Sequence, residues 1–207
     1  MNHLYTLAGA GALGAASGGA YLIHNSISKT SEPTLRSRLE KEHYSVMDPS
    51  DGNWTTVLSK YKEAGVLADK KFSDLSGEVT DHSIKQKCNS VLSSGDSSLY
   101  EKAKLWCTVP RTIQQRLEDL KITLLKTTGD DENGDKTNWN KLKDKYQKAT
   151  SDQKIKNFTI ATPTEDNAWQ SLRTECAKHL SKDRWDVEYD YFLDKVTTWC
   201  SSKLLNE

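Results

Sequence analysis

The segment Leu99-Tyr-Glu-Lys-Ala-Lys-Leu-Trp-Cys-Thr108 has a counterpart near the C-terminus, Phe192-Leu-Asp-Lys-Val-Thr-Thr-Trp-Cys-Ser201. Both begin with two apolar residues, continue with an acid and a lysine, and end in Trp-Cys and a hydroxyl residue. The apolar residues of each segment recur at positions i, i+4, i+7 and i+8, which lie on one face of an α-helix. We therefore expect two amphipathic helices, each of which ends in Trp-Cys.

Further patterns are shared by the two parts of the chain. Thr34-Leu-Arg-Ser-Arg-Leu-Glu40 corresponds to Thr112-Ile-Gln-Gln-Arg-Leu-Glu118, and in each part a tryptophan precedes a tyrosine by seven residues and a cysteine precedes a leucine by four. Turn-forming stretches rich in Gly, Pro, Asp and Ser separate these patterns. The sequence therefore predicts an all-α fold, in which residues 29–108 and 109–207 are tandem copies of one small unit of three or four short helices.

The aromatic residues of these patterns have the spacing of a buried helical face. Aromatic side chains in such a stripe more often pack in a core than stack on a ligand, because they bury a large apolar area. We therefore expect six structural anchors in the helical cores: Trp54, Tyr61, Trp106, Trp139, Tyr146 and Trp199.

The four cysteines fall two to each predicted unit, at corresponding places. If the helices that carry them pack side by side, Cys88 faces Cys107 and Cys176 faces Cys200, and each pair is a candidate disulfide. The alternative is four buried free thiols, since cysteine also behaves as a small core residue. The redox compartment decides between the two. A zinc site is not expected, because the chain has no Cys-x-x-Cys motif.

The N-terminal residues 1–28 contain no Lys, Arg, Asp or Glu. Within them, residues 4–23 are mostly Leu, Ala, Gly and Ile, and as a helix they would span about 30 Å, the thickness of the hydrocarbon core of a bilayer. The sequence therefore predicts an N-terminal membrane helix or signal anchor, with the membrane as a partner through residues 4–23. Small-residue stretches such as Ala15-Ala-Ser17 leave signal cleavage and secretion open, although the basic region that precedes a signal peptide's apolar core is missing.

The same segment contains Gly9-Ala-Gly11-Ala-Leu-Gly14, which has the glycine spacing of a dinucleotide-binding loop. Such a loop requires a preceding strand and further βα units. The chain continues instead into a polar linker, and no later stretch reads as a buried parallel strand. We expect no cofactor.

Composition and motifs restrict the function classes. The chain of 207 residues has 29 basic and 29 acidic side chains, so it lacks the basic excess that gives nucleic-acid-binding proteins much of their affinity. No nucleophile elbow, phosphate loop or metalloprotease helix is present. The acidic turn Asp130-Asp-Glu-Asn-Gly-Asp135 does not fit a calcium loop. With Gly134 at the sixth position of such a loop, the first and twelfth positions are Gly129 and Asn140, which have no carboxylate. We expect neither a nucleic-acid partner, nor a metal, nor an enzyme.

The uncharged Gly/Ala-rich N-terminus, the Trp-x6-Tyr and Cys-x3-Leu patterns and the helix that ends Trp-Cys-Thr, followed by Pro and Arg-Leu-Glu, resemble a known group. The chain is similar to the paralogous families of uncharacterised, N-terminally anchored proteins of haemotropic mycoplasmas. The resemblance covers nearly the whole chain, and it implies an exported or anchored protein of a wall-less bacterium, with a role in host interaction or antigenic variation. It implies no catalytic residue.

Two functional hypotheses follow. The first is a single-pass, membrane-anchored helical protein whose body is extracellular and has a binding, host-interaction or antigenic role. The second is a cytoplasmic-facing adaptor or ligand-binding module that is tethered to the membrane. Lys29, Arg36, Arg38 and Lys41 follow the apolar span and favour the second under the positive-inside rule. The duplicated cysteine pairs favour the first.

Overall fold

The computed structural model describes residues 33–63, 65, 67–129 and 134–205, and these residues belong to one compact unit. The described part is all-helical, as the sequence predicts, and contains isolated β-bridges but no strand. The predicted membrane segment, residues 1–28, lies outside the described residues. None of the helices that are described is both long enough and apolar enough to cross a bilayer.

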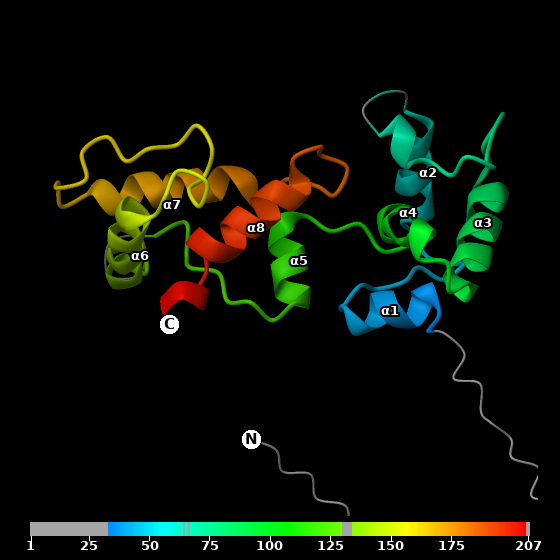
Figure 1. Ribbon diagram of the computed structural model, residues 1–207, viewed down its shortest axis with the longest axis horizontal. Coiled ribbons are helices and arrows are strands. Elements are labelled where there is room, and N and C mark those ends of the chain that lie inside the picture. The colour runs from blue at the N-terminus through cyan, green and yellow to red at the C-terminus, as the bar shows by residue number, and fades with distance from the viewer. Residues whose placement is uncertain (1–32, 64, 66, 130–133, 206–207) are drawn as a thin grey trace, which may run out of the picture. The chain divides into compact units, whose positions relative to one another are not determined.

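Eight α-helices are present in the described residues, and they form two groups (Figure 1). The first half contains α1 (Leu35–Lys41), α2 (Trp54–Lys62), α3 (Asp81–Ser93) and α4 (Tyr100–Trp106). The second half contains α5 (Ile113–Asp119), α6 (Lys136–Lys148), α7 (Ala168–His179) and α8 (Tyr189–Trp199). Three short 3-10 helices accompany them: η1 (Ala68–Lys70), η2 (Ser97–Leu99) and η3 (Lys203–Leu205). In the first half α3 packs against α1, α2 and α4, and in the second α7 packs against α6 and α8.

Helices α1 and α5 begin and end in the same way. The side chains of Thr34 and Thr112 accept hydrogen bonds from backbone N–H groups three residues later, which satisfies donors that a helix start leaves free. After each helix one residue adopts a left-handed backbone, His43 with φ 61° and Lys121 with φ 58°. The chain then turns back toward the helix that ends in Trp-Cys.

All six expected anchors are buried, and none is more than 4% exposed. Tyr61 meets Trp106 edge to face, with ring centroids 4.8 Å apart, and Tyr146 meets Trp199 at the same distance. The indole N–H of Trp106 donates to the carbonyl oxygen of Lys70 at 2.8 Å. That of Trp199 donates to the carbonyl oxygen of Gln153 at 2.9 Å, so each buried ring also has its polar atom satisfied.

Two disulfides join the cysteines within each half. Cys88 on α3 is bonded to Cys107 at the end of α4, with a Cα–Cα distance of 5.4 Å, and Cys176 on α7 is bonded to Cys200 at the end of α8, at 5.7 Å. The expected pairing is therefore confirmed, and no cysteine is free. A disulfide stabilises chiefly by restricting the unfolded chain, and loops of this length contribute about 3 kcal/mol each.

The two Trp-Cys helices differ at their starts. Helix α8 begins at Tyr189, before Phe192, whereas α4 begins only at Tyr100, and Leu99 belongs to η2. The expected apolar stripe in the first half therefore starts one residue ahead of its α-helix. Leu99 nevertheless packs against the first core.

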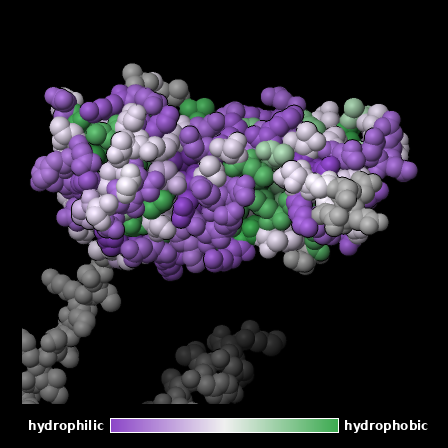
Figure 2. All heavy atoms as spheres, turned by 180° about the vertical axis from the view of Figure 1, so that it is seen from behind, coloured by the Kyte–Doolittle hydropathy of each residue, from purple (hydrophilic) through white to green (hydrophobic). Residues whose placement is uncertain are grey.

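Charged residues cover the outside of these small cores. Figure 2 shows one face of the molecule, on which hydrophilic residues dominate and hydrophobic ones gather mainly in a central strip. Only 35% of the residues are hydrophobic and 28% are charged, so most large apolar side chains are needed for the cores. Among the described residues, Val187 is the large hydrophobic residue that is exposed.

Candidate functional site

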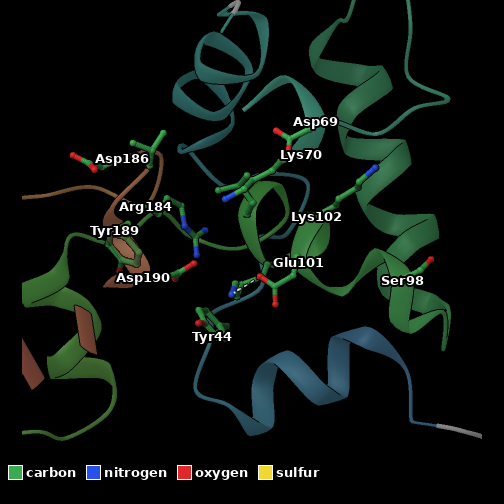
Figure 3. Close-up of a pocket in the computed structure, with 13 residues that line it drawn as sticks. Tyr44, Asp69, Lys70, Ser98, Glu101, Lys102, Arg184, Asp186, Tyr189 and Asp190 are labelled. Carbon is green, nitrogen blue, oxygen red and sulfur yellow. Dashed lines mark ion pairs between the residues drawn. The ribbon is translucent and has the colours of Figure 1, made fainter. Parts of the chain in front are cut away.

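A cleft of about 300 Å³ lies where residues of both halves come together (Figure 3). The first half contributes a wall from the segment after α1, from η1 and from α4, and the second half contributes the α7–α8 connection and the start of α8. The residues that line it include Tyr44, Asp69, Lys70, Glu101, Lys102, Lys104, Leu105, Arg184, Asp186, Val187, Tyr189 and Asp190.

The connection between α7 and α8 supplies the central residue of the cleft. Cys176 and Cys200 are 24 residues apart in sequence, whereas Cys88 and Cys107 are 19 apart, so the second half has a longer connection. This longer connection carries Arg184, whose guanidinium Nη1 donates to the carbonyl oxygen of Thr108 at 2.9 Å and to its hydroxyl at 2.6 Å. Arg184 is 8% exposed. It therefore joins the second half to the residue that directly follows the first disulfide.

A second buried arginine joins the halves from α5. Arg116 donates from Nη1 to the carbonyl oxygen of His43 at 2.6 Å and from Nη2 to that of Glu42 at 2.7 Å. Its guanidinium carbon lies 3.6 Å from the ring centroid of Tyr44. The last carbonyls of a helix carry partial negative charge, so the end of α1 is a favourable place for a cation.

Neither arginine has a carboxylate partner within ion-pair distance among the described residues, in contrast to Arg111, which is 2.9 Å from Asp119. The Nε of Arg116 is buried and finds no hydrogen-bond acceptor in the described part. Burial lowers the pKa of Arg184 to about 10, and the positive charges of Arg116 and Arg111 act in the same direction. Arg184 is thus still protonated at neutral pH, and the junction of the halves holds an excess of buried positive charge.

Two of the acidic residues that line the cleft have ion-pair partners. Lys104 lies 2.5 Å from Glu101, the contact drawn dashed in Figure 3, and Asp186 lies 2.8 Å from Lys182. Burial raises the pKa of Tyr189 above its usual value, so its hydroxyl stays protonated at neutral pH. The cleft therefore offers a buried guanidinium, phenol groups and a charged rim, but no nucleophile paired with a general base.

The residues singled out from the sequence lie elsewhere. The four cysteines and the six aromatic anchors are brought together in the two cores, and none of them lines this cleft. The sequence reasoning missed Arg116 and Arg184. The arginine shared by Arg-Leu-Glu40 and Arg-Leu-Glu118 and the extra residues before α8 are visible in the sequence, but neither pattern indicates contact with the other half.

No protein-family model matches the chain, and no curated protein or solved structure is significantly similar to it. No group of three or more metal-ligating side chains occurs in the part that the structure describes. The fold and the cleft together define an all-α protein with two disulfide-bonded helical halves.

Proposed function

We propose that this chain is a membrane-anchored, exported binding protein built from two copies of one helical unit, and not an enzyme. In this proposal residues 1–28 anchor the chain through a helix, residues 29–108 and 109–207 are the two units, and the body faces the outside of the cell. Its role is in binding, host interaction or antigenic variation, in keeping with the resemblance to the anchored families of haemotropic mycoplasmas.

The duplication is supported by hydrogen bonds that recur at corresponding positions. Met47 N–H donates to the carbonyl oxygen of Cys107 at 3.1 Å, and Leu125 N–H donates to that of Cys200 at 2.9 Å. Phe72 N–H donates to the hydroxyl of Tyr61 at 2.9 Å.

Its counterpart in the second half is the donation from Ile155 N–H to the hydroxyl of Tyr146 at 3.1 Å. The bonds to the carbonyl oxygens of Cys107 and Cys200 join segments that are distant along the chain. Two unrelated helical bundles would not be expected to share hydrogen bonds at corresponding sequence positions.

The two disulfides are the observation that carries the export proposal. Cys88–Cys107 and Cys176–Cys200 use all four cysteines, and each bond lies in the core of its half. Disulfides of this kind form and persist in oxidising environments and are rare in the cytosol. We give the disulfides, which favour export, more weight than the basic residues after the apolar span, which favour a cytoplasmic body.

A binding role is supported by the chemistry of the cleft. It has a buried guanidinium without a carboxylate partner, but no pair of groups in it is arranged for nucleophilic or general acid–base catalysis. Recognition of a ligand requires only such placed polar groups in a concave surface.

The location is tested on intact cells that produce the full chain. We expect externally added protease to remove the body, and we expect unreduced, denatured protein to react with no thiol-alkylating reagent until a reductant is added. A cytosolic thiol protein produced in the same cells serves as the control for leakage. A body that resists protease and has four reactive thiols would contradict export and favour the cytoplasmic-facing, membrane-tethered alternative.

A further inference from the structure

We infer that the cleft between the two halves binds a small monocarboxylate with an apolar body, whose carboxylate pairs with Arg184. This inference rests on the binding role proposed above. It does not depend on where the body is located, because it concerns only the folded protein.

The buried guanidinium of Arg184 has no carboxylate partner within ion-pair distance among the described residues. It is more than nine-tenths buried, and its Nη1 donates two hydrogen bonds, both to neutral oxygens of Thr108. Figure 3 shows its side chain running from the α7–α8 connection into the space beside Lys70 and Tyr44. A buried charge without a counter-charge costs several kcal/mol, and a carboxylate ligand would remove much of this cost.

The planar guanidinium also matches a carboxylate geometrically. Arginine can donate two parallel hydrogen bonds to the two oxygens of a carboxylate, and such charge-assisted bonds are among the strongest in proteins. Arg116, which is buried at the same junction, adds positive charge there, and after burial itself this charge contributes to the lowered pKa of Arg184. This positive charge also favours a bound anion beside Arg184.

The walls of the cleft limit the charge and size of the ligand. Asp69, Glu101, Asp186 and Asp190 balance the four basic residues of the lining, so a ligand with several negative charges would meet repulsion at the rim. The volume of about 300 Å³ is at the lower end for ligand sites. A small acid with one carboxylate satisfies both limits, whereas a nucleotide or a polyphosphate does not.

An apolar body is indicated by the remaining lining. Val187 is 58% exposed, although the exposed surface of the described part otherwise lacks large hydrophobic residues, and it lines the cleft together with Leu105. The rings of Tyr44 and Tyr189 lie on the same cleft. A ligand that covers Val187 while it pairs with Arg184 would bury the apolar surface that the fold leaves open.

The test is a titration of the purified, oxidised full chain with hexanoate, followed by protein chemical shifts in NMR. We expect saturable binding with a dissociation constant on the order of 1 mM, the value expected of a ligand with few atoms. Hexylamine has the same apolar body and the opposite charge, so it is expected to bind at least tenfold more weakly. Inorganic phosphate, which has the charge but no apolar body, is also expected to bind at least tenfold more weakly.

Two variants locate the site. Arg184→Gln is expected to weaken hexanoate binding at least tenfold, whereas Arg36→Gln is expected to leave it unchanged, because Arg36 is an exposed residue of α1 that pairs with Glu40. Val187→Asp adds a negative charge at an exposed position, so the protein should fold normally and bind hexanoate at least fivefold more weakly. This second variant keeps the inference testable if Arg184→Gln does not fold.

The inference would be overturned by an absence of saturable hexanoate binding to the folded chain, by equal binding of hexylamine, or by an unchanged affinity in Val187→Asp. Equally tight binding of phosphate would show a general anion site and would also refute it. None of these results would bear on export, which the protease experiment on intact cells tests separately.

Discussion

Trp106 is the residue on which the packing of the first half depends most directly. It is fully buried, it meets Tyr61 edge to face, and its indole N–H is bonded to the carbonyl oxygen of Lys70. We expect Trp106→Ala to lower the free energy of unfolding by about 3–5 kcal/mol, because the change leaves a cavity and an unpaired carbonyl. The urea midpoint measures this effect. Val187→Ala, at an exposed site, is the control, with an expected change within about 0.5 kcal/mol.

Glu175 of α7 gives stability a dependence on pH. Burial raises the pKa of this carboxyl, but hydrogen bonds from Lys178 and His179 outweigh burial and hold the pKa below its usual 4.5. A carboxyl whose pKa is lower in the folded state stabilises the protein at neutral pH and loses this contribution as the carboxyl becomes protonated. We therefore expect Glu175→Gln to lower the melting temperature at pH 7.

The difference from the parent should shrink as the pH falls from about 4.5 downward, because the parent then loses the same interaction. Thermal melts at several pH values measure this trend. Glu78→Gln replaces an exposed carboxyl and is the control. A difference that stays constant between neutral and acid pH would mean that the carboxylate charge of Glu175 contributes nothing.

At the scale of secondary-structure elements, each disulfide fastens the end of one helix to a neighbouring helix, α4 to α3 and α8 to α7. Helix α4 has only seven residues, and isolated helices of this length are unstable in water, so α4 depends on its tertiary contacts. We expect Cys88→Ala with Cys107→Ala to lower the free energy of unfolding by about 2–4 kcal/mol. The Cys176–Cys200 disulfide closes a loop of similar length. Cys176→Ala with Cys200→Ala should therefore lower the free energy of unfolding by a similar amount.

Denaturant titrations of the two double variants, with the oxidised parent beside them, measure these costs. A double variant as stable as the parent would mean that the disulfide it lacks contributes nothing to the free energy of unfolding. A single Cys→Ala change is not suitable, because it leaves a reactive thiol.

The local part of this architecture could be predicted from the sequence. Trp, Tyr, Leu and Cys recur at helical spacing, and burial of those faces follows from simple periodicity. The pairing Cys88–Cys107 follows from two helices that pack through such faces. The contacts of Arg116 and Arg184 could not be predicted, because they join residues more than 70 positions apart. Arg184 also lies in a loop insertion that has no periodic pattern.

At the scale of the whole described unit, side chains of the second half reach the first half at the junction, and Trp185 packs against the first core. Arg116 and Arg184 together supply four hydrogen bonds to the first half, at Glu42, His43 and Thr108. We expect the parent to unfold in one calorimetric transition. Arg116→Gln combined with Arg184→Gln is expected to give two transitions, since each half has its own core and disulfide.

Arg38 provides the matched control for this experiment. It occupies the position in α1 that Arg116 occupies in α5, but it stacks on Tyr100 and bonds to Ser97, both in its own half. Arg38→Gln should therefore preserve the single transition. One transition in the double variant as well would show that the coupling runs through other contacts.

Because both disulfides lie inside a half, each closes a loop that contains a helix–helix connection: residues 94–99 between α3 and α4, and residues 180–188 between α7 and α8. A single backbone cut in either loop leaves the two fragments covalently joined through sulfur. A cut between Cys107 and the start of α5, outside both loops, separates the halves covalently. A protease that cuts the second loop would thus release no fragment until the disulfide is reduced.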